Sequence, residues 1–158
     1  MEKVISIGKQ NFASLRENHY FFVDKSHFIK DWWENGDEIT LITRPRRFGK
    51  TLNMSMLDCF FSNKYAARGD LFEGLGVWKE EKYRELQGKY PVIFLSFAAV
   101  KADQLSEAKI QIKQQIARVY EENRYLLDGD LLSGNEKKAY NEVNLHMGDA
   151  EAAAALNN

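Results

Sequence analysis

The sequence has little of several features that mark specialised classes of protein. Its 158 residues include one cysteine, Cys59, and two prolines. A single cysteine cannot form an internal disulfide, and no apolar run approaches the roughly 20 residues needed to span a membrane. The formal net charge of −1 gives no sign of a surface that is basic throughout. We therefore expect a cytoplasmic globular protein with no membrane-spanning segment.

Metal-binding and thiol chemistry are also scarce. The three histidines, His19, His27 and His146, show no spacing typical of metal ligands, either with one another or with Cys59. Cys59 lies among apolar residues of an expected helix, which favours a buried small hydrophobic residue over a nucleophile. We expect neither a zinc site nor a reactive thiol.

One segment does carry a chemical signal. The apolar residues 39–43 lead into Gly49-Lys50-Thr51, and apolar residues at helical spacing follow over residues 52–61. A strand, a Gly-Lys-Thr turn and a helix form the arrangement of a phosphate-binding loop. Such a loop directs backbone N–H groups, the positive end of a helix dipole and a lysine ammonium at polyphosphate, and a hydroxyl at Mg²⁺. Lys50 and Thr51 are the candidates for those two side-chain roles.

The first position of this loop departs from the usual G-x-x-x-x-G-K-[ST] pattern, because Arg44 stands where glycine normally allows a tight turn. Arg44 followed by Pro45 requires an extended entry into the loop. A bare Gly-Lys-Ser/Thr triplet arises by chance in roughly one chain in ten of this length, so the flanking pattern carries the interpretation. The candidate phosphate-contacting residues are Arg44, Pro45, Arg46, Arg47, Phe48, Gly49, Lys50 and Thr51.

Two segments resemble the bacterial AAA-ATPase-like family: residues 20–26, Y-F-F-V-D-K-S, and residues 41–51, L-I-T-R-P-R-R-F-G-K-T. In that family a Y-x-V-D-K-[TS] segment precedes an R-P-R-R-F-G-K-[ST] loop by about twenty residues, and arginine at the first loop position is the family's own variant. Residues 90–97 look like the family's next core strand, and the similarity thins over residues 100–158. The resemblance implies ATP and Mg²⁺ as ligands, with Lys50 in a catalytic role and Thr51 on the metal.

The spacing of apolar residues predicts alternating helices and strands. The expected elements are a helix over residues 25–34 capped by Asp24, a strand at 39–43, a helix after the loop, short helices and loops over 62–90, a strand at 92–97, a helix over 103–122 and a final helical stretch from 136 that is broken at Gly148. This order implies an α/β, P-loop NTPase-like fold with a parallel sheet flanked by helices. Two strands make too small a sheet, so we expect residues 1–158 to be the N-terminal portion of a larger AAA-ATPase-like domain.

ATP hydrolysis requires a carboxylate at the end of an apolar strand, and residues 92–97 end instead in Ser96 and Phe97. No Walker B acid is therefore identified; in the family it comes later, and full-length members often carry a PD-(D/E)XK nuclease-like region. We expect ATP binding here and Mg²⁺-dependent hydrolysis in the full-length protein, with a homo-oligomer left open. The alternatives are a non-hydrolysing nucleotide- or anion-binding interaction module and, more weakly, a nucleic-acid-binding module that uses the arginine loop.

Overall fold

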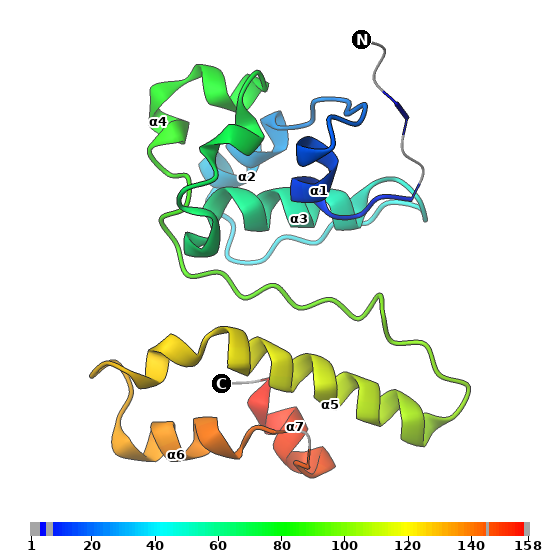
Figure 1. Ribbon diagram of the computed structural model, residues 1–158, viewed down its shortest axis with the longest axis vertical. Coiled ribbons are helices and arrows are strands. Elements are labelled where there is room, and N and C mark those ends of the chain that lie inside the picture. The colour runs from blue at the N-terminus through cyan, green and yellow to red at the C-terminus, as the bar shows by residue number, and fades with distance from the viewer. Residues whose placement is uncertain (1–3, 6–7, 145, 157–158) are drawn as a thin grey trace. The chain divides into compact units, whose positions relative to one another are not determined.

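Helices make up both of the units into which the chain divides, residues 1–92 and residues 93–158 (Figure 1). This computed structural model describes residues 4–5, 8–144 and 146–156. The first unit contains α1 (Phe12–Glu17), α2 (His27–Asn35), α3 (Lys50–Phe61), the 3-10 helices η1 (Asn63–Tyr65), η2 (Gly69–Phe72) and η3 (Gly76–Lys79), and α4 (Glu81–Arg84). The second contains α5 (Leu105–Glu122), η4 (Arg124–Leu127), α6 (Gly134–Glu142) and α7 (Asp149–Ala155).

The core of the first unit forms around α3, which buries Met56, Cys59 and Phe60. Phe60 meets Phe72 of η2 edge to face, with ring centroids 5.0 Å apart, and Phe72 stacks on Phe12 of α1 at 5.1 Å. Such aromatic pairs add to the stabilisation that comes from buried apolar area. The core thus joins three elements, α1, α3 and η2, around the helix that follows the Gly-Lys-Thr sequence.

A buried hydrogen bond also fixes α1 against α3. The Phe12 N–H, one of the donors that the start of a helix leaves without an intrahelical partner, donates to Ser55 Oγ at 3.0 Å. The Asn11 side chain caps α1 by accepting from the Ser14 N–H at 2.8 Å. The first turn of α1 is therefore held in place by both its own cap and α3.

Asp24 and Ser26 attach the start of α2 to η3. The Asp24 carboxylate accepts from the Ser26 N–H at 2.8 Å and from the Gly76 N–H at 2.7 Å, and the buried Ser26 hydroxyl accepts from the Val77 N–H at 3.1 Å. Partial desolvation pulls the pKa of Asp24 upward, but the hydrogen bonds from Ser26 and Gly76 outweigh it and leave that pKa below its ordinary value. Asp24, expected to cap α2, instead links segments 52 residues apart in the sequence.

A close backbone contact joins the end of α3 to residues 88–90. The Gly88 N–H donates to Phe60 O at 2.8 Å, and the Tyr90 N–H donates to Phe61 O at 2.9 Å. Gly88 has a φ of +70°, and a Cβ at this position would lie 2.3 Å from Ala66 Cα. This position requires glycine for both its conformation and the space it occupies.

The expected α/β fold with a parallel sheet is wrong. Within residues 4–5, 8–144 and 146–156 the structure has no strand, and pairing is limited to an isolated parallel bridge between Ser62 and Tyr90. Residues 39–43 and 92–97, the two expected strands, have no regular structure, and Ile39 and Ile93 are 88% and 72% exposed. An apolar, β-favouring sequence becomes a strand only when a neighbouring backbone pairs with it. No described segment does so here.

The second unit is organised by α5, an 18-residue helix close to the one that the apolar spacing predicts. The Tyr120 hydroxyl donates to Ala155 O at 2.9 Å, and Ile116 packs with Met147 in a small buried cluster, so α7 lies against α5. The expected helical stretch from residue 136 is interrupted earlier than Gly148, because α6 ends at Glu142; a new helix, α7, does begin at Asp149 with Gly148 as its N-cap. None of the helices in the described ranges combines the length and apolar character needed to cross a membrane.

Replacing Ser26 by alanine is expected to lower the free energy of unfolding of the first unit by about 1 to 3 kcal/mol. The substitution leaves the Val77 N–H without its acceptor in a buried position, and an unmet buried donor is costly. Urea denaturation followed by tryptophan fluorescence measures the change. The matched control is Lys25→Ala at the exposed neighbouring position; equal unfolding midpoints for the Ser26→Ala and Lys25→Ala variants would contradict this role of the hydroxyl.

Asp149 is expected to make the second unit sensitive to acid. Hydrogen bonds from Lys109 at 2.5 Å and Lys113 at 2.8 Å lower the pKa of Asp149 to about 2. Because the pKa of Asp149 is depressed in the folded state, its ion pairs stabilise the second unit above the ordinary aspartate pKa of about 3.9. This stabilisation is lost as pH falls towards 2.

The stability difference between the wild type and Asp149→Asn should therefore be present at pH 6 and shrink between about pH 4 and pH 2. Thermal unfolding followed by circular dichroism at several pH values measures it. Asp130→Asn, at an exposed position in the same unit, is the control. A difference that stayed constant over this pH range would contradict the role of the ion pairs.

Candidate functional site

The predicted phosphate loop is an exposed turn that ends at the first residue of α3. Lys50 begins this 12-residue helix, and Gly49 is its N-cap with φ 74° and ψ 17°, in the left-handed region. A Cβ added to Gly49 would have no heavy atom within 4 Å, so its requirement is conformational and not steric. The first turn of α3 contains no acidic residue that would oppose a bound anion.

The backbone of the loop leaves hydrogen-bond donors free to meet a ligand. Gly49 O accepts from the Asn53 N–H at 2.9 Å, which starts the helical ladder. In the part of the chain that the structure describes, no hydrogen bond reaches the N–H groups of Lys50, Thr51 or Leu52. Arg47 also adopts a left-handed φ of 70°, so two left-handed residues lie within the three that precede α3. These features suit an anion-binding turn at a helix N-terminus.

Lys50 folds back over the loop. Its ammonium donates to Arg44 O at 2.5 Å and to Pro45 O at 2.9 Å. These bonds join the first and last parts of the loop, so the lysine encloses the turn from one side. Two neutral carbonyls are weaker partners for an ammonium than phosphate oxygens are, because phosphate adds the attraction between opposite charges. Lys50 is thus held beside the turn by bonds that a polyphosphate can replace.

The loop is strongly cationic and its charges are not neutralised within the described residues. Arg44, Arg46 and Arg47 are exposed, and none of them forms an ion pair with an acid in the described ranges. Phe48 is also 60% exposed, whereas Gly49 is half-buried. A guanidinium can bind two phosphate oxygens at once, so these side chains extend the anion-binding capacity of the turn.

Thr51 is half-buried in the first turn of α3, one residue after Lys50. No group of three or more histidine, cysteine or acidic side chains that could hold a metal occurs among the residues the structure describes. A threonine hydroxyl fits Mg²⁺ when phosphate oxygens and water supply its other ligands. The donor set of this loop therefore fits a metal that arrives with a polyphosphate.

The single cysteine is enclosed in the first unit. Cys59 lies on the buried side of α3 and is fully inaccessible to solvent. Burial raises the pKa of its thiol to about 11. The expectation of a buried small hydrophobic residue is confirmed, since Cys59 belongs to the buried core of the first unit.

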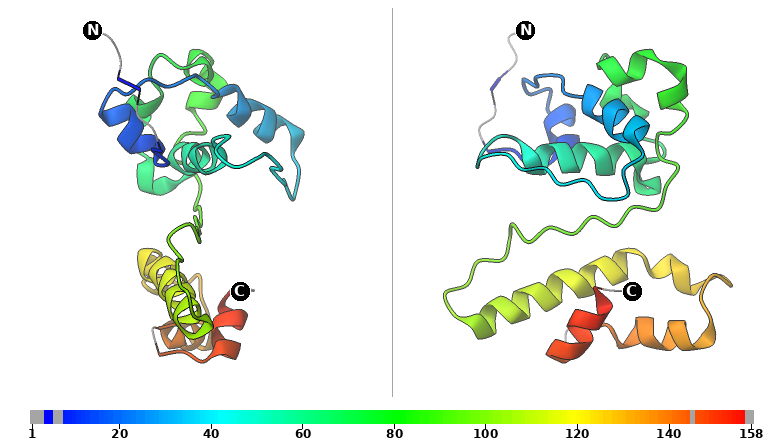
Figure 2. Two further views of the ribbon diagram at one scale, coloured as in Figure 1. Left: turned by 90° about the vertical axis from the view of Figure 1, so that its right-hand side faces the viewer. Right: turned by 180° about the vertical axis from the view of Figure 1, so that it is seen from behind.

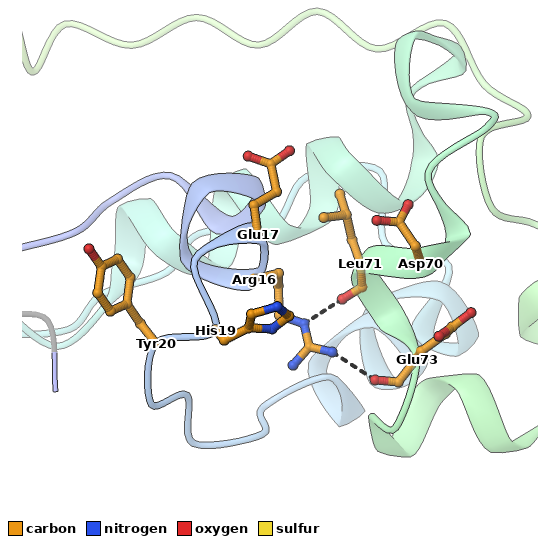
Figure 3. Close-up of a pocket in the computed structure, with 7 residues that line it drawn as sticks. All are labelled: Arg16, Glu17, His19, Tyr20, Asp70, Leu71 and Glu73. Carbon is orange, nitrogen blue, oxygen red and sulfur yellow. Dashed lines mark hydrogen bonds between the residues drawn. The ribbon is translucent and has the colours of Figure 1, made fainter. Parts of the chain in front are cut away.

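A hollow lies between α1 and η2, and none of the predicted site residues lines it (Figure 3). It has a volume of about 540 Å³. The Arg16 guanidinium spans one side and donates to Leu71 O and Glu73 O, each at 2.7 Å. Sequence reasoning missed this hollow, because its walls come from segments some fifty residues apart. Its lining residues are Arg16, Glu17, His19, Tyr20, Asp70, Leu71 and Glu73.

Comparison with known proteins assigns the chain to a family. The sequence profile of a family described as predicted AAA-ATPase matches residues 6–150. The chain belongs to this family. A protein of Azotobacter chroococcum mcd 1, named as an uncharacterized protein in the vnfD 5' region, is 36% identical over 96 residues, which are 60% of this chain and 17% of that protein. No solved structure matches.

The description of this family names a predicted ATPase. The chain covers less than a fifth of the length of its relative from Azotobacter chroococcum mcd 1. The loop of residues 44–51 lies inside residues 6–150, the range that the family profile matches.

Replacing Gly49 by alanine should destabilise the start of α3 by about 1 to 2 kcal/mol, because an L-residue pays that strain in the left-handed region. No steric clash contributes, since space is open around the position. Denaturant unfolding compares Gly49→Ala with Gly49→Asn, which tolerates this conformation better and should lie between the alanine variant and the wild type. An alanine variant as stable as the wild type would rule out the left-handed cap.

Proposed function

We propose that this chain binds ATP together with Mg²⁺ on the loop of residues 44–51. The observation that carries the proposal is the junction of Gly49 and Lys50. Gly49, in a left-handed conformation, precedes a 12-residue helix whose first residue is Lys50, and this junction occurs in a member of the predicted AAA-ATPase family. Free N–H groups, the helix dipole and an ammonium converge on this junction.

The proposal gives separate tasks to Lys50, to Thr51 and to two of the arginines of the loop. Lys50 leaves its two carbonyl partners and binds the β- and γ-phosphates, while the N–H groups at the start of α3 bind the remaining phosphate oxygens. The Thr51 hydroxyl supplies one ligand to Mg²⁺. Arg46 and Arg47 approach the outer phosphates, since both are exposed next to the turn.

Binding, without turnover, is the activity proposed for residues 1–158. Hydrolysis needs a carboxylate that holds Mg²⁺ or its water, and residues 92–97 end in Ser96 and Phe97. We propose that Mg²⁺-dependent hydrolysis belongs to the longer protein, as its family suggests. An interaction module that uses nucleotide binding without hydrolysis is distinguished by the absence of phosphate release from that longer protein.

A second candidate, nucleic-acid binding, is favoured by one observation. Three exposed arginines without ion pairs in the described ranges flank Phe48, which is 60% exposed, and arginine with an exposed aromatic ring suits single-stranded nucleic acid. This candidate predicts binding of an oligonucleotide that weakens steeply with salt and is unaffected by Mg²⁺-ATP.

Mg²⁺-ATP should bind the wild type and bind the Lys50→Ala variant at least tenfold more weakly, because a charge-assisted contact to phosphate is removed. Isothermal titration calorimetry measures both affinities. Circular dichroism establishes that each protein is folded before it is titrated.

The matched control is Lys89→Ala, which removes an exposed lysine from the same unit. Equal affinity of the Lys50→Ala and Lys89→Ala variants would contradict the proposed site. Thr51→Val adds a second test: its affinity for ATP should become insensitive to Mg²⁺ while affinity for metal-free ATP is retained.

A further inference from the structure

Helix α2 is firmly attached to the rest of the first unit. Lys30 pairs with Glu80, and the Glu34 carboxylate accepts hydrogen bonds from Lys82, at 2.7 Å, and from the Tyr83 hydroxyl. On another side the aromatic rings near the end of α2 pack against the end of α3. Together with the contacts at its start, these bonds hold α2 in place, so a segment that contacts α2 is held in place too.

The segment that leads from α2 into the loop is, by contrast, weakly attached. Within the described chain no backbone-to-backbone hydrogen bond involves residues 37–48. None of these residues belongs to the buried cores. In the left view of Figure 2 the segment swings away from the helices of its unit before it returns to the start of α3. Side-chain contacts must therefore set the path by which the chain enters the loop.

One such contact is a hydrogen bond of 3.1 Å from Trp32 Nε1, on α2, to Thr40 Oγ1. The Trp32 ring is itself held, since it packs against the core with its centroid 5.3 Å from that of Phe61. In the described ranges no other hydrogen bond connects residues 37–48 to a helix residue outside the loop. The two bonds of the Lys50 ammonium join residues of the loop to one another.

We infer that Trp32 is a positioning residue for the phosphate loop and that it acts through Thr40. Its indole N–H fixes the middle of the lead-in segment to α2, so that the loop enters from a defined direction four residues later, at Arg44. Its effect on ligand affinity rests on the proposed ATP site, whereas its effect on the path of the loop does not.

Loss of this bond should increase the population of open loop conformations. An intramolecular hydrogen bond of this kind changes a local equilibrium by about two- to tenfold. Trypsin reports that population, because Arg46 and Arg47 are exposed cleavage sites in the loop, while Arg44 is protected by the proline that follows it.

The experiment measures initial rates of cleavage after Arg46 and Arg47 by mass spectrometry, under native conditions and at low trypsin concentration. Thr40→Val and Trp32→Phe should each be cleaved two- to tenfold faster than the wild type, and the double variant no faster than either single one. Thr40→Ser keeps the hydroxyl and should be cleaved at the wild-type rate.

Two controls separate loop positioning from general destabilisation. Trp33→Phe changes the neighbouring ring, which stacks on Phe61 and lies at a tilt against Tyr90. Among the described residues Trp33 donates no hydrogen bond to the lead-in segment, so this variant should be cleaved at the wild-type rate. Cleavage after Lys89, outside the loop, should be equal in all variants. Wild-type rates for both Thr40→Val and Trp32→Phe would overturn the inference, as would an equal increase after Lys89.

Mg²⁺-ATP titration of the same variants distinguishes this inference from the proposed function. Faster loop cleavage with two- to tenfold weaker ATP binding supports both. Faster loop cleavage in a protein that binds no ATP supports the positioning role and overturns the proposed ligand. Unchanged cleavage and unchanged ATP affinity overturn the positioning role and leave the ATP site standing.

Discussion

The first unit depends on the packing of α3, which has two tasks along one helix. Its later turns bury Met56, Cys59 and Phe60 against α1 and η2, and its first residue is Lys50. A rigid helix transmits its placement from one end to the other, so the apolar contacts that stabilise the unit also determine where the ammonium and the free N–H groups lie. Stability and the candidate site therefore share one element.

The loop itself is held from two directions that differ in strength. Its end is fixed by α3, while its beginning follows a lead-in segment with no backbone hydrogen bonds in the described chain. Such a segment has much conformational entropy to lose when a ligand orders it. The contact of Trp32 to Thr40 reduces that loss by restricting the segment beforehand.

Much of the helical structure could be predicted from the sequence, because periodicity is a local property. The spacing of apolar residues located α3, and also α5 to within two residues. The strands were predicted on equally local grounds and were wrong, since residues 39–43 and 92–97 have no pairing partner in the described chain. The bond between Asp24 and Gly76 and the hollow beside Arg16 depend on contacts about fifty residues apart, which one sequence does not reveal.

A titration of the ¹⁵N-labelled protein with Mg²⁺-ATP, followed by ¹H–¹⁵N correlation spectra, tests directly whether the start of α3 is a polyphosphate site. The same spectra test whether the helices around that site hold it in place. If the site lies there, the shifts should be concentrated in the amides of residues 47–52 and in the indole N–H of Trp32, with the amides of η2 unchanged. Shifts centred instead on the hollow between α1 and η2, or no shifts at saturating Mg²⁺-ATP, would contradict it.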